Sequence, residues 1–353
     1  MQKGTSTVKI FIKHYRRKMN KILTFIISIG IAITSYASFW PWANNDNNTD
    51  ESVIKIASMP TFGALQPITY EIIKQLPEVA KKHGLKVRGE AVKVKNSIDG
   101  NAFLVNEQID VNVGAISSFL TLHSKAPDSA RILSGLGQYR FMLMCQNDIK
   151  TYDDVLKTKI AVSSPKTMEN KVLRWLAVNE LKNASAFEKS VIVLPRPQIY
   201  QMFKANSKDI RCVITGTPLQ NQLLNDFNLN IIGYSDPKNN GFTGSYSHYW
   251  TSTKWAKNNP KLALIFAETA VKAINEYNQN PKPILDYFIV NDKMETTAEK
   301  MLQYEEQNVA QWHTDMRDAE QIKDFLWDSK YLKNNRPQSV AEFILHPEIT
   351  EKK

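Results

Sequence analysis

Residues 105–120 read VNEQIDVNVGAISSFL, and the order of residue types in this stretch decides how the chain is interpreted. Apolar and polar residues alternate through IDVNV, which predicts a strand, and an apolar helical pattern resumes at SSFL. The Gly-Ala-Ile-Ser-Ser between them suits a tight turn and a helix cap. The same small and hydroxyl residues also leave backbone N–H groups accessible to a ligand at a helix N-terminus. Both interpretations remain open from this stretch alone.

The first 37 residues form a basic and then apolar leader. Seven lysines and arginines and no acidic residue precede ILTFIISIGIAITSYA at 22–37, which ends in the small-x-small pattern Ser35-Tyr36-Ala37. This order predicts a secretory signal peptide cleaved after Ala37 and a periplasmic location. The alternative is a membrane anchor, which is disfavoured because a run of about 16 residues is short of the roughly 20 that span a bilayer.

The net charge of +10 comes mostly from this leader. Seven of the 45 basic residues and none of the 35 acidic residues lie in it, so residues 38–353 carry a net charge of +3. This near balance gives no support to nucleic-acid binding, which needs a basic patch or stripe. The length of residues 38–353 suits one large domain or two lobes.

Cys145 and Cys212 are the two cysteines of the chain, and each lies in an apolar strand-like run, FMLMC and IRCVI. Export would allow them to pair, but two buried free thiols are an equal alternative. Two cysteines without nearby partner ligands do not make a zinc site.

Residues 38–52 are rich in Asn and Asp, which predicts a disordered spacer, and strand-like and helix-like segments alternate from Val53 onward. The first series predicts strands at 53–58, 85–92, 109–114, 130–137 and 138–146, and helices at 61–84, 98–106 and 117–126. The second predicts strands at 158–164, 190–195, 209–215 and 230–235, helices at 165–181, 197–206 and 218–226, and further helices at 261–280 and 296–313. This alternation predicts an α/β fold with mainly parallel sheets covered by helices. Two series favour two lobes over the alternative of one large doubly wound sheet.

Two helix starts carry capping signals. Ser164 is expected to cap the helix that follows, with Pro165 in its first turn. Thr296 and Glu299 have the spacing of a capping box at the start of TTAEKMLQYEEQ.

The succession of these segments resembles a known family. VIKIASMPTFGALQPITYEIIKQLPEVAKKHGLKV, NAFLVNEQIDVNVGAISSFL, IKTYDDVLKTKIAVSSPKTMENKVLRWLAVNEL and WAKNNPKLALIFAETAVKAINEY follow the order seen in periplasmic solute-binding proteins of ABC transporters. The likeness is to the nitrate/sulfonate/taurine-type branch, which includes pyrimidine-precursor binders, and it runs through most of residues 52–290. The chain departs from the family pattern at Leu156-Lys157-Thr158-Lys159 and at Thr215-Gly216-Thr217-Pro218, and the second departure touches the expected cleft.

The resemblance implies a type II periplasmic binding fold, with two α/β lobes joined by two extended crossings near residues 137–141 and 243–252. It implies one lobe made of residues 53–139 plus 248–353 and a second made of residues 140–247. It also implies a monomeric binding protein without cofactor or metal, which delivers a small solute to an ABC permease in the inner membrane.

Four βα junctions, two from each lobe, are expected to face the cleft because each combines small residues with hydroxyls. They supply the candidate ligand-binding residues Thr61, Phe62, Gly114, Ala115, Ser117, Ser118, Ser163, Ser164, Thr167, Thr215 and Thr217. The serines at 117 and 118 can equally be turn and cap residues, and the aromatic ring at 62 can stack on a planar solute or pack in the core.

The crossings add further candidates. Arg140 at the first crossing can pair with an anion in a bidentate way or be a solvated hinge residue. Tyr246 and His248 lie among the aromatic residues of the second crossing, where they can line an apolar wall or pack between the lobes.

Catalysis is disfavoured because the sequence has no nucleophile elbow, no phosphate-binding loop and no histidine pair at metal-ligand spacing. Two alternatives to transport remain. One is a secreted sensor or adhesion module that keeps the fold, and the other is an enzyme resembling fungal pyrimidine-precursor synthases.

Overall fold

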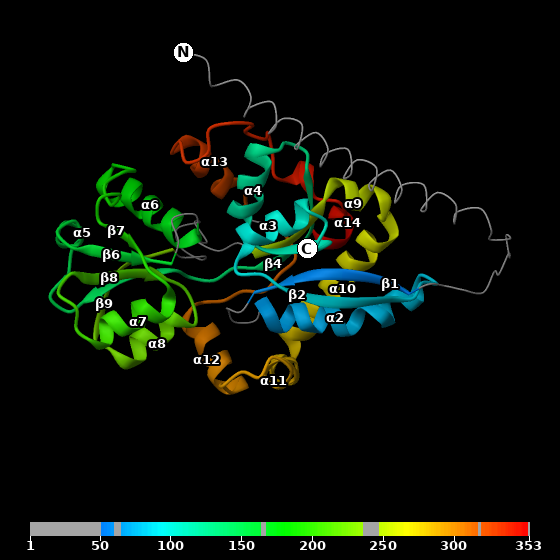
Figure 1. Ribbon diagram of the computed structural model, residues 1–353, viewed down its shortest axis with the longest axis horizontal. Coiled ribbons are helices and arrows are strands. Elements are labelled where there is room, and N and C mark those ends of the chain that lie inside the picture. Colours follow the sequence, from blue (N-terminus) through cyan, green and yellow to red (C-terminus); the bar gives the residue numbers. More distant parts are fainter. Residues whose placement is uncertain (1–50, 60–64, 164–166, 236–246, 317–318, 352–353) are drawn as a thin grey trace, which may run out of the picture. The chain divides into compact units, whose positions relative to one another are not determined.

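The computed structural model describes residues 51–59, 65–163, 167–235, 247–316 and 319–351. The expected signal peptide and nearly all of the expected spacer lie outside the described residues. Figure 1 shows two sheets, one formed by the early part of the chain and one by its middle part, each with helices beside it.

The first sheet has five strands in the order β2-β1-β3-β10-β4. Its strands are β1 (Ser52–Ser58), β2 (Val87–Lys93), β3 (Val111–Ala115), β4 (Ala130–Gly137) and β10 (Ser247–Ser252). Strand β1 runs parallel to β2 and β3, whereas β10 is antiparallel to both of its neighbours. The long alternating βα units therefore place their strands side by side and in the same direction, as such units normally do.

Most helices accompany the first sheet. They are α2 (Leu65–Lys82), α3 (Ser97–Val105), α4 (Ile116–Lys125), α9 (Thr253–Asn258), α10 (Pro260–Gln279), α11 (Pro281–Asn291), α12 (Ala298–Gln307), α13 (Ala319–Asp328) and α14 (Pro347–Thr350). Helix α10 packs on α2 and β4, and α13 packs on α4, so the C-terminal helices return to the first sheet (Figure 1).

The second sheet has the order β7-β6-β8-β5-β9 and the same pattern of directions. Its strands are β5 (Met142–Gln146), β6 (Lys159–Val162), β7 (Val191–Val193), β8 (Ile210–Thr215) and β9 (Leu229–Tyr234), with helices α5 (Tyr152–Val155), α6 (Met168–Leu181), α7 (Arg196–Lys204) and α8 (Leu219–Asp226). Strand β5 is antiparallel to β8 and β9, and the other pairs are parallel. We call each sheet with its helices a lobe.

The apolar run of β5 is explained by burial on both faces of the second sheet. Met142 and Met144 belong to the cluster that packs against α7 and α8, whereas Leu143 and Cys145 belong to the larger core on the other face. Cys145 and Cys212 stand opposite each other on β5 and β8 and form a disulfide. Pairing is therefore the correct alternative of the two left open by the sequence.

The chain passes from the first sheet to the second between the end of β4 at Gly137 and the start of β5 at Met142. This agrees with the expected position of the first crossing. The chain returns between Tyr234 and Ser247, and most of that connection lies outside the described residues.

Two helix starts differ from the predictions. Helix α12 is capped by Thr297, whose hydroxyl accepts from the Lys300 N–H, so the cap lies one residue beyond the predicted Thr296. Helix α6 begins at Met168 with Thr167 at the N-cap position, and Ser164 and Pro165 lie outside the described residues.

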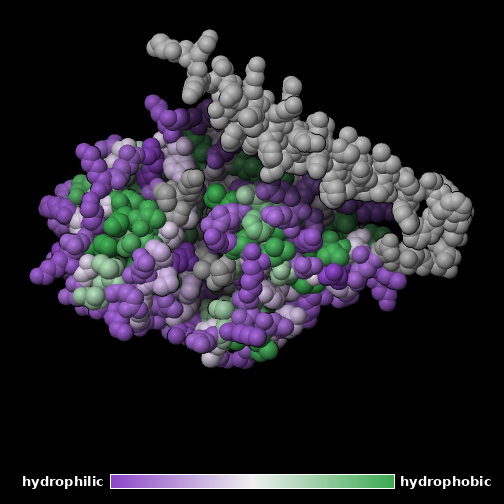
Figure 2. All heavy atoms as spheres, viewed as in Figure 1, coloured by the Kyte–Doolittle hydropathy of each residue, from purple (hydrophilic) through white to green (hydrophobic). Residues whose placement is uncertain are grey.

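Among the described residues, no helix has the length and apolarity needed to cross a membrane. The face seen in Figure 2 is mostly hydrophilic, with hydrophobic side chains in separate small groups. This mixture is usual for a protein surface in contact with water.

Candidate functional site

Described residues of the two lobes line an open cavity of about 330 Å³. Its walls come from strand ends and from the helix starts that follow them, which is where open α/β sheets bind ligands. The size lies near the lower end of the range of about 300–1,000 Å³ that is usual for small-molecule sites.

Gly114 lies in β3, one residue before the strand ends at Ala115. It has a φ of +143°, and a Cβ added there would lie 2.5 Å from the Cβ of Ser97 at the start of α3. The glycine therefore allows α3 to approach β3 closely. Gly114 and Ala115 line the cavity, and α4 starts at Ile116 without a side-chain cap.

The two serines of this junction have different roles. Ser118 lines the cavity, and its hydroxyl lies 2.7 Å from that of Ser97, which also lines it. Asn101 Nδ2 donates to the Ser118 carbonyl, and Trp250 Nε1 donates to Asn101 Oδ1, so the core fixes this wall. Ser117 is fully buried and points to the second lobe, where its hydroxyl contacts Met168 Sδ at 3.4 Å.

The sequence reasoning missed the junction between β2 and α3. Asn96 caps α3 by accepting from the N–H groups of Ile98 and Asp99, and Asn96, Ser97 and Ile98 all line the cavity. The Asn-Ser pair that precedes this helix is the same kind of signal as at the four predicted junctions.

The second lobe presents a buried ion pair to the cavity. Glu169, in the first turn of α6, is 1 % exposed and accepts from Ser163 Oγ at 2.7 Å and from Arg196 Nη2 at 3.0 Å. All three residues line the cavity. The sequence reasoning included Ser163 and missed the pair, because a charged residue in a helix start usually points to solvent.

Aromatic rings of the first crossing form an apolar wall. Tyr139 and Phe141 stack with ring centroids 5.4 Å apart, and both line the cavity. A Cβ at Gly216 would lie 3.1 Å from both rings. Arg140 alternates with them, and its guanidinium lies 4.5 Å from the ring centre of Tyr234.

Lys171 lies near this site on the buried side of α6. Its side chain is 1 % exposed, and Nζ donates to Ser117 Oγ at 3.0 Å across the boundary between the lobes. Burial lowers the pKa of the Lys171 amine to about 7, although the nearby Glu169 carboxylate acts to raise it.

The structure places the predicted ligand-binding residues in three groups. Those that line the cavity are Gly114, Ala115, Ser118, Ser163 and Thr167. Those that lie outside its described lining are Ser117, Arg140, Thr215, Thr217 and His248. Those that lie outside the described residues are Thr61, Phe62, Ser164 and Tyr246.

His248 packs in the core of the first lobe. Its ring is stacked 4.9 Å from that of Trp250 and meets the edge of Phe119 at 5.8 Å. Strand β10 is the fourth of five strands in its sheet, so its side chains are buried on both faces. Thr215 and Thr217 are also buried.

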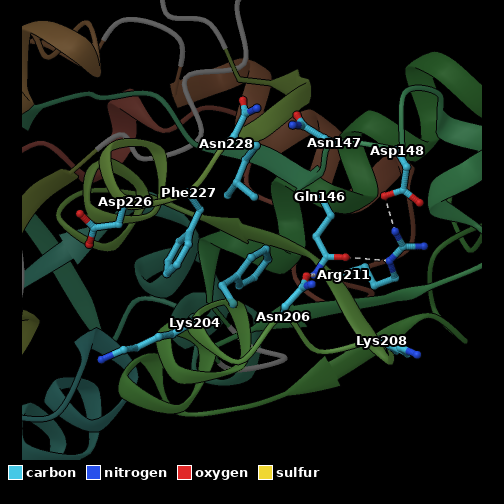
Figure 3. Close-up of a pocket in the computed structure, with 12 residues that line it drawn as sticks. Gln146, Asn147, Asp148, Lys204, Asn206, Lys208, Arg211, Asp226, Phe227 and Asn228 are labelled. Carbon is cyan, nitrogen blue, oxygen red and sulfur yellow. Dashed lines mark hydrogen bonds and ion pairs between the residues drawn. The ribbon is translucent and has the colours of Figure 1, made fainter.

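A second hollow, of about 800 Å³, lies at the opposite end of the second sheet, where β8 begins and β5 ends (Figure 3). Arg211 there donates to Gln146 Oε1 at 2.9 Å and pairs with Asp148. Because this hollow lies at the amino end of the parallel strands, and its arginine is already paired, we assign no site to it.

The described residues include no cluster of three or more His, Cys, Asp or Glu side chains that could hold a metal ion. The polar groups at the described lining of the cavity are hydroxyls, amides, one ion pair and the Lys95 amine, which suit the binding of an organic or oxyanion solute.

Comparisons with known proteins give a likeness in structure alone. No protein-family model matches the chain, and no curated protein matches its sequence. The periplasmic aliphatic sulphonate-binding protein SsuA from Escherichia coli aligns with a TM-score of 0.63 at 12 % identity, over 85 % of this chain and 99 % of that one. The alkanesulfonate-binding SsuA from Xanthomonas axonopodis pv. citri, bound to MOPS, aligns with a TM-score of 0.62 at 12 % identity, over 83 % and 98 %. A DSZB mutant in complex with biphenyl-2-sulfinic acid aligns with a TM-score of 0.54 at 14 % identity, over 85 % and 99 %.

The two sheets, their strand orders and these alignments define the class of fold. The chain has the periplasmic binding protein fold, as the sequence analysis predicted. At such identities the likeness extends to the fold and no further.

Proposed function

We propose that this chain is an exported solute-binding protein of an ABC importer, which encloses a small solute between its lobes and delivers it to a membrane permease. The observation that carries the proposal is the cavity itself. Both lobes and the first crossing contribute to its wall, and polar groups from helix starts of each lobe converge on it. A solute held there would contact both lobes at once, so it would stabilise their closed arrangement by its differential affinity.

Export is supported by two independent features. The leader of residues 1–37 has the order of a signal peptide. The Cys145–Cys212 disulfide also fits an oxidising compartment such as the periplasm. We propose cleavage after Ala37, a spacer over 38–52, a first lobe of residues 53–139 plus 248–353, and a second lobe of residues 140–247.

We propose a solute that is either a compact anion of the sulfonate or nitrate kind or a planar ring of the pyrimidine kind. Lys95 brings positive charge to the cavity, where Arg196 is already paired with Glu169, and it favours an anionic group. The stacked rings of Tyr139 and Phe141 favour a planar or apolar body. We propose binding rather than catalysis because structural neighbours are named mainly as binding proteins. We also propose that the protein acts as a monomer without a cofactor.

Thermal unfolding tests the proposal. The protein is melted with a panel of nitrate, alkyl and aryl sulfonates, amino acids and aminopyrimidines. A solute at one hundred times its dissociation constant should stabilise the native state by about 2.7 kcal/mol, or about 5 °C for a chain of this size.

Variants then locate the site. Ser118→Ala and Thr167→Ala should reduce the shift in melting temperature that a hit produces, whereas Ser185→Ala, at an exposed serine of the second lobe, should leave it unchanged. No shift across the whole panel would contradict transport of these solutes and would favour the sensor or adhesion alternative, whose partner is another protein.

A further inference from the structure

The contact between the lobes contains a buried lysine, whose side chain is 1 % exposed. Lys171 is on α6 of the second lobe, one helical turn after Met168, which lines the cavity. Its amine donates to Ser117 of α4 and lies 5.4 Å from the ring centre of Tyr331, in the segment after α13. Both partners belong to the first lobe, Ser117 in α4 and Tyr331 in the segment after α13, so separation of the lobes would bring water to the amine.

A buried ammonium is costly, and a hydrogen bond to a hydroxyl returns only part of its lost hydration. Lysines in such places commonly lose their proton instead. We propose that Lys171 gives up its proton when the lobes close, so that the closed arrangement is coupled to the release of one proton. This inference rests on the proposed function because it assumes that the lobes separate and close around a solute.

The described charged groups near Lys171 have the following contacts. On its own helix, Glu169 is held by Arg196 at 3.0 Å, and Arg174 pairs with Glu188 at 2.9 Å. From the first lobe, Tyr331 faces it, and burial raises the pKa of the Tyr331 hydroxyl, which therefore stays neutral over the range of interest. Among these described neighbours, the lysine itself is the group expected to change charge near neutral pH.

The sign and size of the effect follow from linkage. In the closed arrangement the pKa of the amine is about 7, and an exposed lysine has a pKa of about 10.4. Below pH 7 the amine is charged in both arrangements, and closing is penalised in full. From pH 6 to 7 the closed-to-open ratio should therefore rise by less than about twofold. Above pH 7 the penalty falls, and the ratio should rise about 50-fold from pH 7 to 9.

Distances between spin labels on the two lobes test the proposal without any solute. Labels on Val105→Cys in the first lobe and Leu156→Cys in the second, both exposed positions, report closure at pH 6, 7, 8 and 9. The closed population should rise with pH above 7. In the Lys171→Met background it should not depend on pH, whereas Ser117→Ala should lower it at every pH and keep the slope.

Two results would overturn the proposal: a closed population that does not change with pH in the labelled wild type, or a slope that persists after Lys171→Met. Ordinary histidines titrate near pH 6.5, below the range where the slope is expected. Since the measurement contains no solute, its outcome is independent of the thermal-unfolding panel, and the two proposals can fail separately.

Discussion

Gly114→Ala tests the role of the glycine near the end of β3. At a φ of +143° an alanine is strained, at a cost of about 1–3 kcal/mol. Its Cβ would also meet the Ser97 Cβ at 2.5 Å, and overpacking of this kind costs about 1–3 kcal/mol more. The variant should therefore lose about 2–6 kcal/mol of unfolding free energy.

Gly84→Ala is the matched control. Gly84 also has a positive φ, +72°, but a Cβ there would meet nothing within 4 Å. It should lose only the conformational part, about 1–2 kcal/mol. Urea unfolding followed by circular dichroism measures both variants. Equal losses at the two glycines would refute the claim that close approach of α3 dictates the glycine at 114.

Three further predictions concern stability. Replacing Cys145 and Cys212 together with alanine should cost up to about 4 kcal/mol of unfolding free energy, because a disulfide that closes a loop of 67 residues restricts the unfolded chain. A cost near zero in urea unfolding would contradict this. Arg196→Ala should cost about 2–5 kcal/mol of unfolding free energy, because it leaves the Glu169 carboxylate buried without its cation. Adding Glu169→Gln should recover part of this loss in a double-mutant cycle, and no recovery would contradict the pairing. Burial lowers the pKa of His123, so below pH 6.5 the unfolded chain binds more protons than the folded chain does. The free energy of unfolding should therefore fall as the pH drops from 7 to 5, and His123→Phe should weaken this fall. An unchanged pH dependence in the variant would contradict this role of His123.

The alternation of strand and helix signals was enough to predict the fold. Each βα junction is short, so Gly114 indicated to within one residue that β3 ends at Ala115 and α4 begins at Ile116. Helix boundaries were less certain, because two adjacent threonines at 296 and 297 can both cap α12 and the choice depends on one hydrogen bond.

The walls of the cavity were only partly predictable. Hydroxyl and small residues at helix starts, such as Ser118 and Ser163, carry a local signal that sequence reasoning can detect. Glu169 and Arg196 are 27 residues apart in the sequence, on α6 and α7. Their ion pair depends on how these two helices lie beside each other. Local patterns contain no information on such pairings.

His248 illustrates a second limit of local patterns. Polar and aromatic residues in SYSHYWTS suggested a wall of the cleft, but β10 lies inside its sheet and both of its faces are covered. A central strand reads as a continuous buried run instead of an alternating one, so the sequence does not reveal which side chains reach a cavity.

Enclosure of a solute between the two lobes can be tested by small-angle scattering of the protein, with and without a compound that raises its melting temperature. The radius of gyration should decrease when the compound binds, and Ser118→Ala should need more compound for the same decrease. A compound that stabilises the protein with no change in the radius of gyration would contradict enclosure between the lobes.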